Sequence, residues 1–472
     1  MKRQAIQSAG ALLGACLLLA GCANKRMQYH PPVAPQLAKA DTWNTPPTGG
    51  AKASPADDKT IAQWWSTLGD PVLTALEERA VKGNLDVRQA EAKIRQARAQ
   101  REGAKGDLYP TVTASGSATG SRTSTRNGGE LGQSYGTGVS ASWEPDFFNR
   151  IRGTVAAYTA DVEATQEDLR NVLVSLTAEV ALNYVDLRSY QSQLAITRAN
   201  LAAQEETYKL TVAKYESGLS TELDVQQAAL SVESTRAGIP TLETGLQKAE
   251  NAISVLVGER PGAVDQELGA VKPVPVILAE VAVGLPADLL RRRPDIRSAE
   301  RQVAAQSARA GVAAANLYPT FNLSGVLSFS SLNIVNLLTP ATLAGSLAGS
   351  VQQTILNRRQ LRAQLNVQDV LLEQYETSYE STVLGALQDV EDALKAFANE
   401  QVRRKSLADA AAAAERAATM SRDLYGSGLK DFLTVLDAQR SLLSLQNQLA
   451  QSDATITANL IRLYKALGGG WS

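Results

Sequence analysis

The segment Leu108-Tyr109-Pro110-Thr111 recurs as Leu317-Tyr318-Pro319-Thr320 in the second half of this 472-residue chain. Other matching pairs follow in the same order at nearly the same offset: Asp86–Glu91 with Asp295–Glu300, Ser115-Gly116 with Ser324-Gly325, Asn149-Arg150 with Asn357-Arg358, Tyr215–Leu219 with Tyr425–Leu429, and Gly258 with Gly468. The spacing is much longer than the period of a solenoid repeat, so the sequence indicates two copies of one domain-sized unit.

Each copy is expected to contain a helix, a β-hairpin and two long helices. The first repeat spans 61–258 with its hairpin at 111–143, and the second spans 286–468 with its hairpin at 320–352. Expected helices are 71–106, 149–215, 221–257, 286–315, 357–425 and 431–467, and expected strands are 111–119, 134–143, 320–330 and 342–352. We expect a Gly/Ser/Asn-rich loop at 120–133, since these residues favour turns. Proline-rich residues 22–60 and residues 259–285 are expected to be linkers, and 469–472 a C-terminal tail.

The long helices carry apolar residues at seven-residue intervals. These are Leu173, Val180, Leu187, Leu194, Leu201 and Tyr208 in the first helix, and Leu442, Leu449, Ile456 and Leu463 in the last. Sustained heptads predict left-handed coiled-coil packing. At about 1.5 Å per residue, helix 149–215 would be about 100 Å long, which suits a duct or rod better than a compact globule.

The expected strands alternate between apolar and small polar residues. Phe321, Leu323 and Leu327 would share one face, with serines and Asn322 on the other, as in transmembrane barrel strands. A half-buried soluble hairpin would give the same pattern. Four strands per chain cannot close a barrel, two chains would give eight strands with a filled interior, and three chains would give twelve strands around a lumen.

The N-terminus has the features of an export signal. Lys2 and Arg3 precede an apolar stretch, Ala9–Ala20, that is too short for a membrane-spanning helix. Leu19-Ala20-Gly21-Cys22 resembles a lipobox, which predicts removal of residues 1–21 and lipidation of Cys22. Ala23 follows, and in the sorting pattern this resembles, the absence of aspartate favours the outer membrane. The alternative is an ordinary cleavage site that happens to precede a cysteine.

Composition argues against several other functions. The chain has 47 basic and 48 acidic residues, so no basic excess suggests nucleic-acid binding. Its one histidine, His30, rules out a metal site built on histidine pairs, and the phosphate-binding motifs GxxxxGK[ST] and GxGxxG are absent. No cofactor, metal or enzymatic activity is therefore predicted. Outside the signal there is no apolar run of about 20 residues, so a membrane crossing would require a barrel.

The duplicated element order and several motifs resemble the TolC-like outer-membrane factors, most closely their lipidated OprM-like branch. The motifs are the two Leu-Tyr-Pro-Thr segments, Trp64-Trp65 with Leu68-Gly69-Asp70-Pro71, and Val435-Leu436-Asp437-Ala438. The resemblance implies a homotrimer in which a twelve-stranded β-barrel continues into a twelve-helix α-barrel. It also implies a periplasmic adaptor and an RND-type inner-membrane pump as partners, and a passive exit duct for drugs or other small toxic compounds.

The resemblance also implies a periplasmic gate. Leu433 and Asp437 match ring-forming positions, and Arg440 matches a basic residue that ties the closed state. Spacings of four and three residues place these three on one helix face. Asp224 matches a position that could meet Lys430 or Arg440, whereas Thr434 stands where some relatives have a second aspartate. The alternative is that Asp437 and Arg440 form only a local i,i+3 pair.

Three other functions remain open at this stage. A channel of a type I protein secretion system would share the fold. A soluble coiled-coil scaffold would explain the heptads but neither the strand pattern nor the lipobox. A lipid-anchored enzyme would lack a catalytic cluster.

Overall fold

The computed structural model describes residues 43–46, 51–52, 58–125, 128–275, 281–282 and 292–471. The predicted signal peptide, Cys22 and most of the 22–60 linker lie outside these ranges. The described chain divides into two compact units. The sheet unit contains Ala92–Gln166 and Ser298–Ser381, and the helical unit contains the described parts of Ala34–Glu91, Glu167–Arg297 and Thr382–Ser472. Each unit draws on both sequence repeats, so the repeats are not separate compact bodies.

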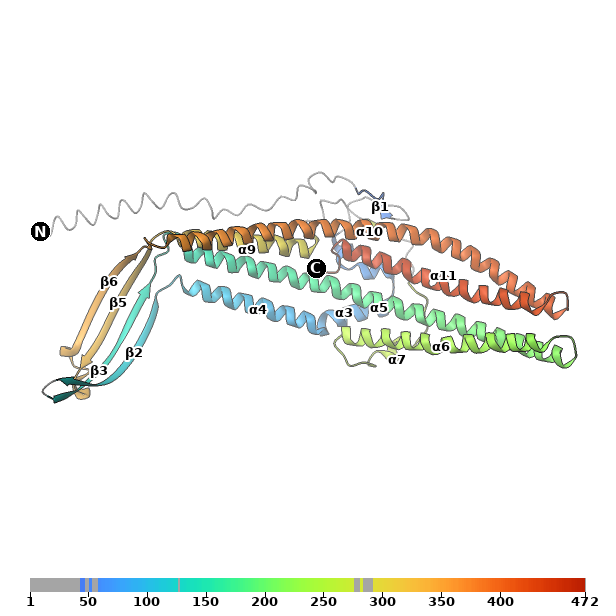
Figure 1. Ribbon diagram of the computed structural model, residues 1–472, viewed down its shortest axis with the longest axis horizontal. Coiled ribbons are helices and arrows are strands. Elements are labelled where there is room, and N and C mark those ends of the chain that lie inside the picture. The colour runs from blue at the N-terminus through green and yellow to red at the C-terminus, as the bar shows by residue number, and fades with distance from the viewer. Residues whose placement is uncertain are drawn as a thin grey trace. The chain divides into compact units, whose positions relative to one another are not determined.

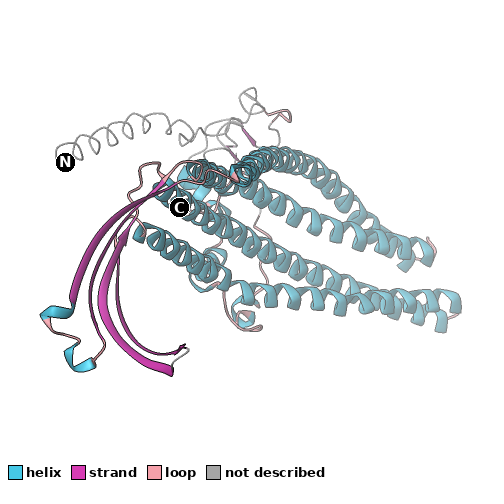
Figure 2. Ribbon diagram, turned by 60° about the vertical axis from the view of Figure 1, so that its left-hand side comes forward, coloured by secondary structure: helices cyan, strands magenta, loops and turns pink. Residues whose placement is uncertain are grey.

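The sheet unit is built on four antiparallel strands in the order β2-β3-β5-β6 (Figures 1 and 2). Their bounds are Thr111–Thr125, Gly128–Trp143, Thr320–Ser331 and Leu343–Gln352. The loop predicted at 120–133 is wrong: the β2–β3 ladder continues through it to the pair Thr125 and Gly128. Backbone groups make the ladder, and the serines and threonines on β2 tolerate extended backbone, so the polar composition did not end the strands.

The strand register confirms the predicted two-faced sheet. Val139 lies opposite Leu327, and Phe321 lies opposite Val351. Residues directly opposite each other project to the same side, so the apolar positions of the strands share one face. The other face carries small hydroxyl side chains, including Thr113 and Ser140, whose oxygens lie 3.1 Å apart.

The Leu-Tyr-Pro-Thr segments join helices to strands. Tyr318 stacks on Phe148 with ring centroids 4.9 Å apart, and Phe147 meets Phe321 edge to face at 5.0 Å. The indole N–H of Trp143 donates to the carbonyl oxygen of Leu108 at 3.0 Å. Aromatic contacts and the Trp143 indole hydrogen bond thus fix the chain where helix changes to strand.

The long helices lie close to their predicted bounds. They are α5 (Arg150–Glu216), α6 (Glu222–Leu256), α9 (Pro294–Ala315), α10 (Arg358–Gly426) and α11 (Phe432–Ala466). Helix α9 begins at Pro294 instead of residue 286, and residues 286–291 lie outside the described ranges. Heptad positions Val180, Leu187 and Leu463 are fully buried, in agreement with coiled-coil packing. No helix within the described ranges has the length and apolarity needed to cross a bilayer.

The single helix predicted for 71–106 is wrong, because Asn84 divides it into α3 (Pro71–Gly83) and α4 (Leu85–Gly106). The Asn84 carboxamide oxygen accepts the N–H groups of Asp86 and Val87, and its amide donates to the carbonyl of Leu256. Asn84 therefore ends one helix and caps the next. The remaining elements are short: β1 Ala51–Lys52, α2 Asp58–Ala62, η2 Trp64–Leu68, α7 Asp265–Leu268, β4 Val281–Ala282, η4 Ile334–Asn336 and η5 Pro340–Thr342.

The duplication extends to the backbone geometry. Asn149 and Asn357, each just before a long helix, have φ of 60° and 65°. Gly218 and Gly428, between the long helices, have φ of 73° and 75°. Left-handed backbone is rare for a residue with a side chain, so its recurrence at matched positions supports two copies of one unit.

Candidate functional site

Two helical turns, one per repeat, join the long helices of the helical unit. In the first, Gly218 donates to the Tyr215 carbonyl at 2.9 Å and Leu219 to the Lys214 carbonyl at 2.8 Å. In the second, Gly428 and Leu429 make the same bonds to Tyr425 and Leu424, at 3.1 and 2.8 Å. Both turns therefore close with a left-handed glycine and a six-to-one backbone bond.

The two turns cap the following helix with the same residue pair in opposite order. Thr221 caps α6 by accepting the Asp224 N–H at 3.2 Å, and the Asp224 carboxylate accepts the Thr221 N–H at 3.1 Å. Asp431 caps α11 by accepting the Thr434 N–H at 3.1 Å, and Thr434 donates its hydroxyl to the same carboxylate. Thr434, which stands where some relatives have a second aspartate, thus completes the Asp431 cap.

The predicted gate residues lie together on one side of α11. Leu433, Asp437 and Arg440 are all exposed, and we call them the gate face. Phe432, Val435, Leu436 and Gln439 are buried on the other side of the helix. Asp437 and Arg440 make no ion pair or hydrogen bond anywhere in the part of the chain that is described. The local pair that was the alternative to a gate is therefore not formed in this protomer.

Asp224 does not pair with Lys430 or Arg440 within the protomer. All its hydrogen bonds enter through Oδ2, from the Ser220 and Thr221 hydroxyls at 2.9 Å and from the Thr221 N–H. Partial burial acts to raise the pKa of Asp224, but these hydrogen bonds outweigh it and lower the pKa. Its Oδ1 atom has no hydrogen bond within the described chain and stays available.

Sequence reasoning missed the cluster that holds the two turns against each other. Tyr425 is buried with Phe432, Val435 and Leu436 of its own repeat and with Ala228 of the first. Lys214 donates to the Tyr425 carbonyl, and its ammonium lies 4.5 Å from the ring centroid. The matching Tyr215 of the first repeat is exposed. The repeated tyrosine was visible in the sequence, but the repeat alone could not show which copy is buried.

The comparisons with known proteins agree with this geometry. A family model described as outer membrane efflux protein matches residues 76–259 and 285–469, well over half of the chain. This chain belongs to the outer membrane efflux protein family. The family resemblance drawn from the sequence is thereby confirmed, as is the prediction of an efflux channel of the outer membrane.

Individual relatives of this efflux protein match along nearly its whole length. Nodulation protein T of Rhizobium leguminosarum bv. trifolii is 33% identical over 465 residues, covering 97% of this chain and 96% of that protein. The solvent efflux pump outer membrane protein SrpC of Pseudomonas putida is 30% identical over 469 residues, 97% of each chain. The solved outer-membrane channel OprN has a TM-score of 0.86 and 33% identity, covering 92% of this chain and 97% of that one.

The two helix pairs of this efflux protein contact each other through neutral polar side chains. Three pairs join α5 to α11: Thr207 with Gln439 at 2.9 Å, Asn200 with Gln446 at 2.8 Å, and Gln193 with Gln451 at 3.4 Å. The α5 members are spaced by seven residues, so they form one stripe of the coiled coil. Neutral hydrogen bonds of this kind can be exchanged for water without leaving a charge unpaired, so this stripe, unlike the cluster around Tyr425, is separable without burying or exposing a charge.

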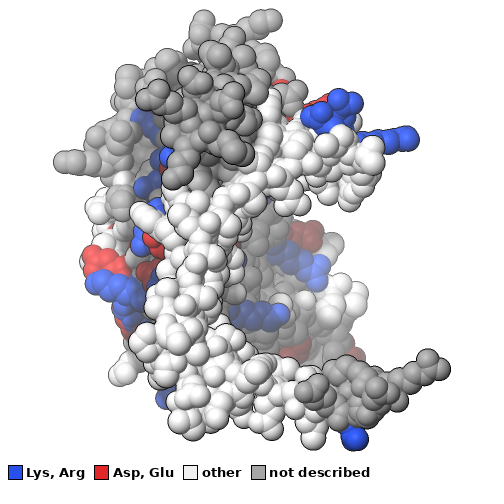
Figure 3. Space-filling model, turned by 90° about the vertical axis from the view of Figure 1, so that its left-hand side faces the viewer, with Lys and Arg blue, Asp and Glu red and all other residues white. Residues whose placement is uncertain are grey.

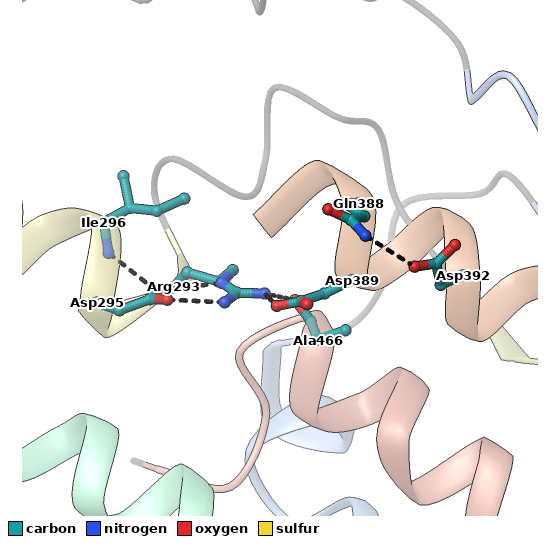
Figure 4. A network of polar contacts seen from close by, with 7 residues as sticks. All are labelled: Arg293, Asp295, Ile296, Gln388, Asp389, Asp392 and Ala466. Atoms are coloured by element: carbon teal, nitrogen blue, oxygen red, sulfur yellow. Dashed lines mark hydrogen bonds and ion pairs between the residues drawn. The ribbon is translucent and has the colours of Figure 1, made fainter. Parts of the chain in front are cut away.

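A charged network in the efflux protein joins the start of α9 and the end of α11 to the middle of α10 (Figure 4). Arg293 donates to both carboxylate oxygens of Asp295 at 3.1 and 2.7 Å, to Asp389 at 3.0 Å and to the Ala466 carbonyl at 3.0 Å. It borders a cleft of about 540 Å³ whose other charged residues include Arg462 and Lys465. Because the guanidinium is already satisfied by its neighbours, we assign it a structural role at the start of α9.

Within the described residues, no three His, Cys, Asp or Glu side chains converge as they would around a metal ion. The buried ionisable groups do not form a reactive cluster either. Glu77 is fully buried with no hydrogen-bond partner, and desolvation raises its pKa well above the ordinary range. Arg188 is fully buried as well, and it donates to Tyr184, Gln191 and the Ala270 carbonyl, which fixes the segment between the repeats to α5.

Proposed function

We propose that three copies of this chain assemble into one conduit, with a closed twelve-stranded β-barrel in the outer membrane and a twelve-helix α-barrel in the periplasm. The observation that carries the proposal is the open sheet. Strands β2 and β6 stand at its edges with no partner among the described strands. Backbone groups of an edge strand cannot remain unpaired in hydrocarbon, so β6 of one copy must pair with β2 of the next. Twelve strands leave a water-filled lumen, whereas eight do not.

Oligomer mass tests this assembly. Mass measurement of the purified protein in detergent is expected to give three chains per particle, and the same particles should conduct ions in planar bilayers. A stable monomer that conducts ions would overturn the barrel.

We further propose that the gate face lines the closed periplasmic end of this conduit. Three-fold symmetry turns Leu433 into an apolar ring and Asp437 into a ring of three like charges that repel one another. Closure then needs compensating contacts, and Arg440 and Lys430 are the cations nearest in sequence to Asp437. The free Oδ1 of Asp224 is a suitable acceptor for either cation from a neighbouring helix pair. The separable α5–α11 stripe supports a gate that opens by movement of one helix pair against the other.

The partners and cargo are part of the same proposal. A passive duct cannot drive efflux against a gradient by itself, so we propose a periplasmic adaptor and an RND-type inner-membrane pump as partners. The adaptor would open the gate by competing for its ties. The relative SrpC is described as part of a solvent efflux pump, which supports drugs or other small toxic compounds as cargo. Deleting the gene is expected to sensitise cells to such compounds, and the single-residue gate variants described below should restore resistance.

Lipidation of Cys22 completes the proposal. The resemblance to a lipobox supports this cysteine as the mature N-terminal residue, and Trp43, further along the chain, is buried. Beside it, the Asn44 and Thr45 N–H groups donate to the Glu391 carboxylate at 2.7 and 2.8 Å. These two hydrogen bonds attach the segment that follows the predicted lipid anchor to helix α10. Cys22→Ser should abolish palmitate labelling while trimers still form, and labelled palmitate in that variant would exclude the site.

A further inference from the structure

The turn between β5 and β6, residues 332–342, exposes a patch of large aliphatic side chains. Leu332, Ile334, Val335 and Leu338 are 79%, 61%, 82% and 71% exposed. The patch sits on the sheet at the end of the hairpin that is not joined to helices, because α9 leads into β5 and β6 leads into α10. Figure 2 shows the short helical turns of this segment at the far end of the strands.

Hydrogen bonds within the turn hold its backbone in place, so the exposure of its aliphatic side chains does not come from a lack of structure. The Asn333 side chain accepts the Val335 N–H at 3.1 Å, and its own N–H donates to Ser331 Oγ at 3.1 Å. The Thr342 hydroxyl donates to the Leu337 carbonyl at 2.7 Å. The polar groups are thus satisfied inside the turn, and two 3₁₀ turns, η4 and η5, direct aliphatic side chains outward.

The whole second hairpin lacks charge. No Asp, Glu, Lys or Arg occurs between Arg309 and Arg358, whereas the first hairpin contains Arg122, Arg126 and Glu130. The space-filling view toward the sheet is correspondingly mostly white (Figure 3). Contiguous exposed apolar surface of this kind indicates contact with a membrane or with another protein.

We propose that the 332–342 turn inserts into the outer leaflet of the outer membrane and contacts lipid acyl chains, as a second anchor besides the predicted lipid on Cys22. The inference rests on the proposed barrel. Two observations favour lipid over protein. The patch continues the apolar sheet face, since Leu343 and Leu347 lie on that face directly after the turn. Its own hairpin also contains no charged residue, so insertion into hydrocarbon would remove no charge from water.

The strand lengths place the turn at the right depth. Strands β5 and β6 have 12 and 10 residues, close to the 9–11 that a tilted transmembrane strand needs. The turn therefore falls at the boundary between hydrocarbon and head groups. Strands β2 and β3 have 15 and 16 residues, so the first hairpin continues beyond that boundary.

Nitroxide accessibility can test the insertion. Single cysteines at Val335, Leu347 and Ser346 would be spin-labelled in a Cys16→Ala/Cys22→Ser background, in trimers reconstituted into phosphatidylcholine vesicles. Collision with oxygen reports lipid, and collision with a nickel chelate reports water. We expect the oxygen-to-nickel ratio at Val335, near the head groups, to lie below that at Leu347, in mid-strand on the apolar face, and to exceed several-fold that at Ser346, on the opposite face.

Three other results would each overturn the inference in a distinguishable way. A water-exposed label at Val335 with a lipid-exposed label at Leu347 removes the inserted turn and keeps the barrel. A label at Val335 that neither reagent reaches means that a neighbouring chain covers the turn. A water-exposed label at Leu347 removes the barrel itself, and the proposed function with it.

Discussion

The two helical turns of the repeats share a backbone and differ in the surface they present. Both close with a left-handed glycine, and both cap the next helix with a threonine–aspartate pair. In the second repeat the gate face reads Leu433, Asp437, Arg440. The matching positions of the first repeat, 210 residues earlier, are Leu223, Gln227 and Leu230. The duplication thus supplies the scaffold twice but the charge once, so three chains would form one charged ring.

The largest expected effect comes from giving the second repeat the neutral residue of the first. Asp437→Gln replaces the three charges of the proposed ring with neutral side chains that are each one methylene longer. A charge about 4 Å from a passing ion contributes about 4 kcal/mol at an effective dielectric constant of about 20. We therefore expect the cation-to-anion permeability ratio to fall by at least about tenfold, and conductance to rise. Reversal potentials in planar bilayers under a salt gradient measure the ratio.

The reciprocal change, Gln227→Asp, is the matched control for that experiment. If only the second repeat lines the bore, a new carboxylate at the first turn should leave selectivity unchanged. Asp409→Asn, at an exposed position of α10, should also have no effect. Shifts of equal size and opposite sign in the permeability ratio of Asp437→Gln and Gln227→Asp would show that both turns face the pore, and the contrast between the two turns would disappear.

Arg440→Leu, which again installs the first-repeat residue, should have the next largest effect. Arg440 makes no ion pair or hydrogen bond with the described residues of its own chain, so any tie it supplies is expected to come from another chain. Exposed ion pairs contribute about 0.2–1 kcal/mol, so the closed tip should open up to about fivefold more often. Single-channel recording at low voltage measures open probability. An unchanged value would mean that Arg440 does not tie the tip.

Leu433→Ala should widen the bore without changing which ions pass. Both turns carry leucine here, so the change removes bulk and leaves the charge pattern intact. We expect a conductance increase smaller than in Asp437→Gln and an unchanged reversal potential. A shifted reversal potential would mean that Leu433 positions the Asp437 ring as well as narrowing it.

The sequence predicted the features that repeat or alternate, and missed those that depend on a partner elsewhere. Heptads and strand alternation gave the long helices and the two-faced sheet because burial follows those periods. The break at Asn84 was missed, since the acceptor that secures it, the Leu256 carbonyl, is remote in sequence. The strand extension through 120–133 was missed because ladder bonds do not depend on side chains.

The candidate site shows the same limit. Helical spacing placed Leu433, Asp437 and Arg440 on one face, and the structure has them so. The capping role of Asp224 was not predicted, although Thr221 three residues earlier is the signature of a capping box. The burial of Tyr425 depends on Lys214 and Ala228 of the other repeat, a contact that no local pattern reveals.

The smallest effects should come from the caps, and they test whether the swapped pair behaves alike in the two turns. Thr221→Ala removes the acceptor for the Asp224 N–H and should cost about 1 kcal/mol at pH 7. Asp431 behaves differently because its capping oxygen titrates. The Thr434 hydroxyl and N–H lower its pKa. A carboxylate with a lowered folded pKa stabilises the fold above its unfolded pKa of about 3.9, and this contribution is lost as pH falls through the folded pKa.

Asparagine caps nearly as well without titrating, so Asp431→Asn should melt like the wild type at pH 7 and lose less stability below about pH 4. Thermal midpoints of detergent-solubilised protein between pH 3 and 7, followed by circular dichroism, measure both variants. If Asp431→Asn follows the wild-type midpoint down to pH 3, the acid sensitivity of the fold does not originate at this cap.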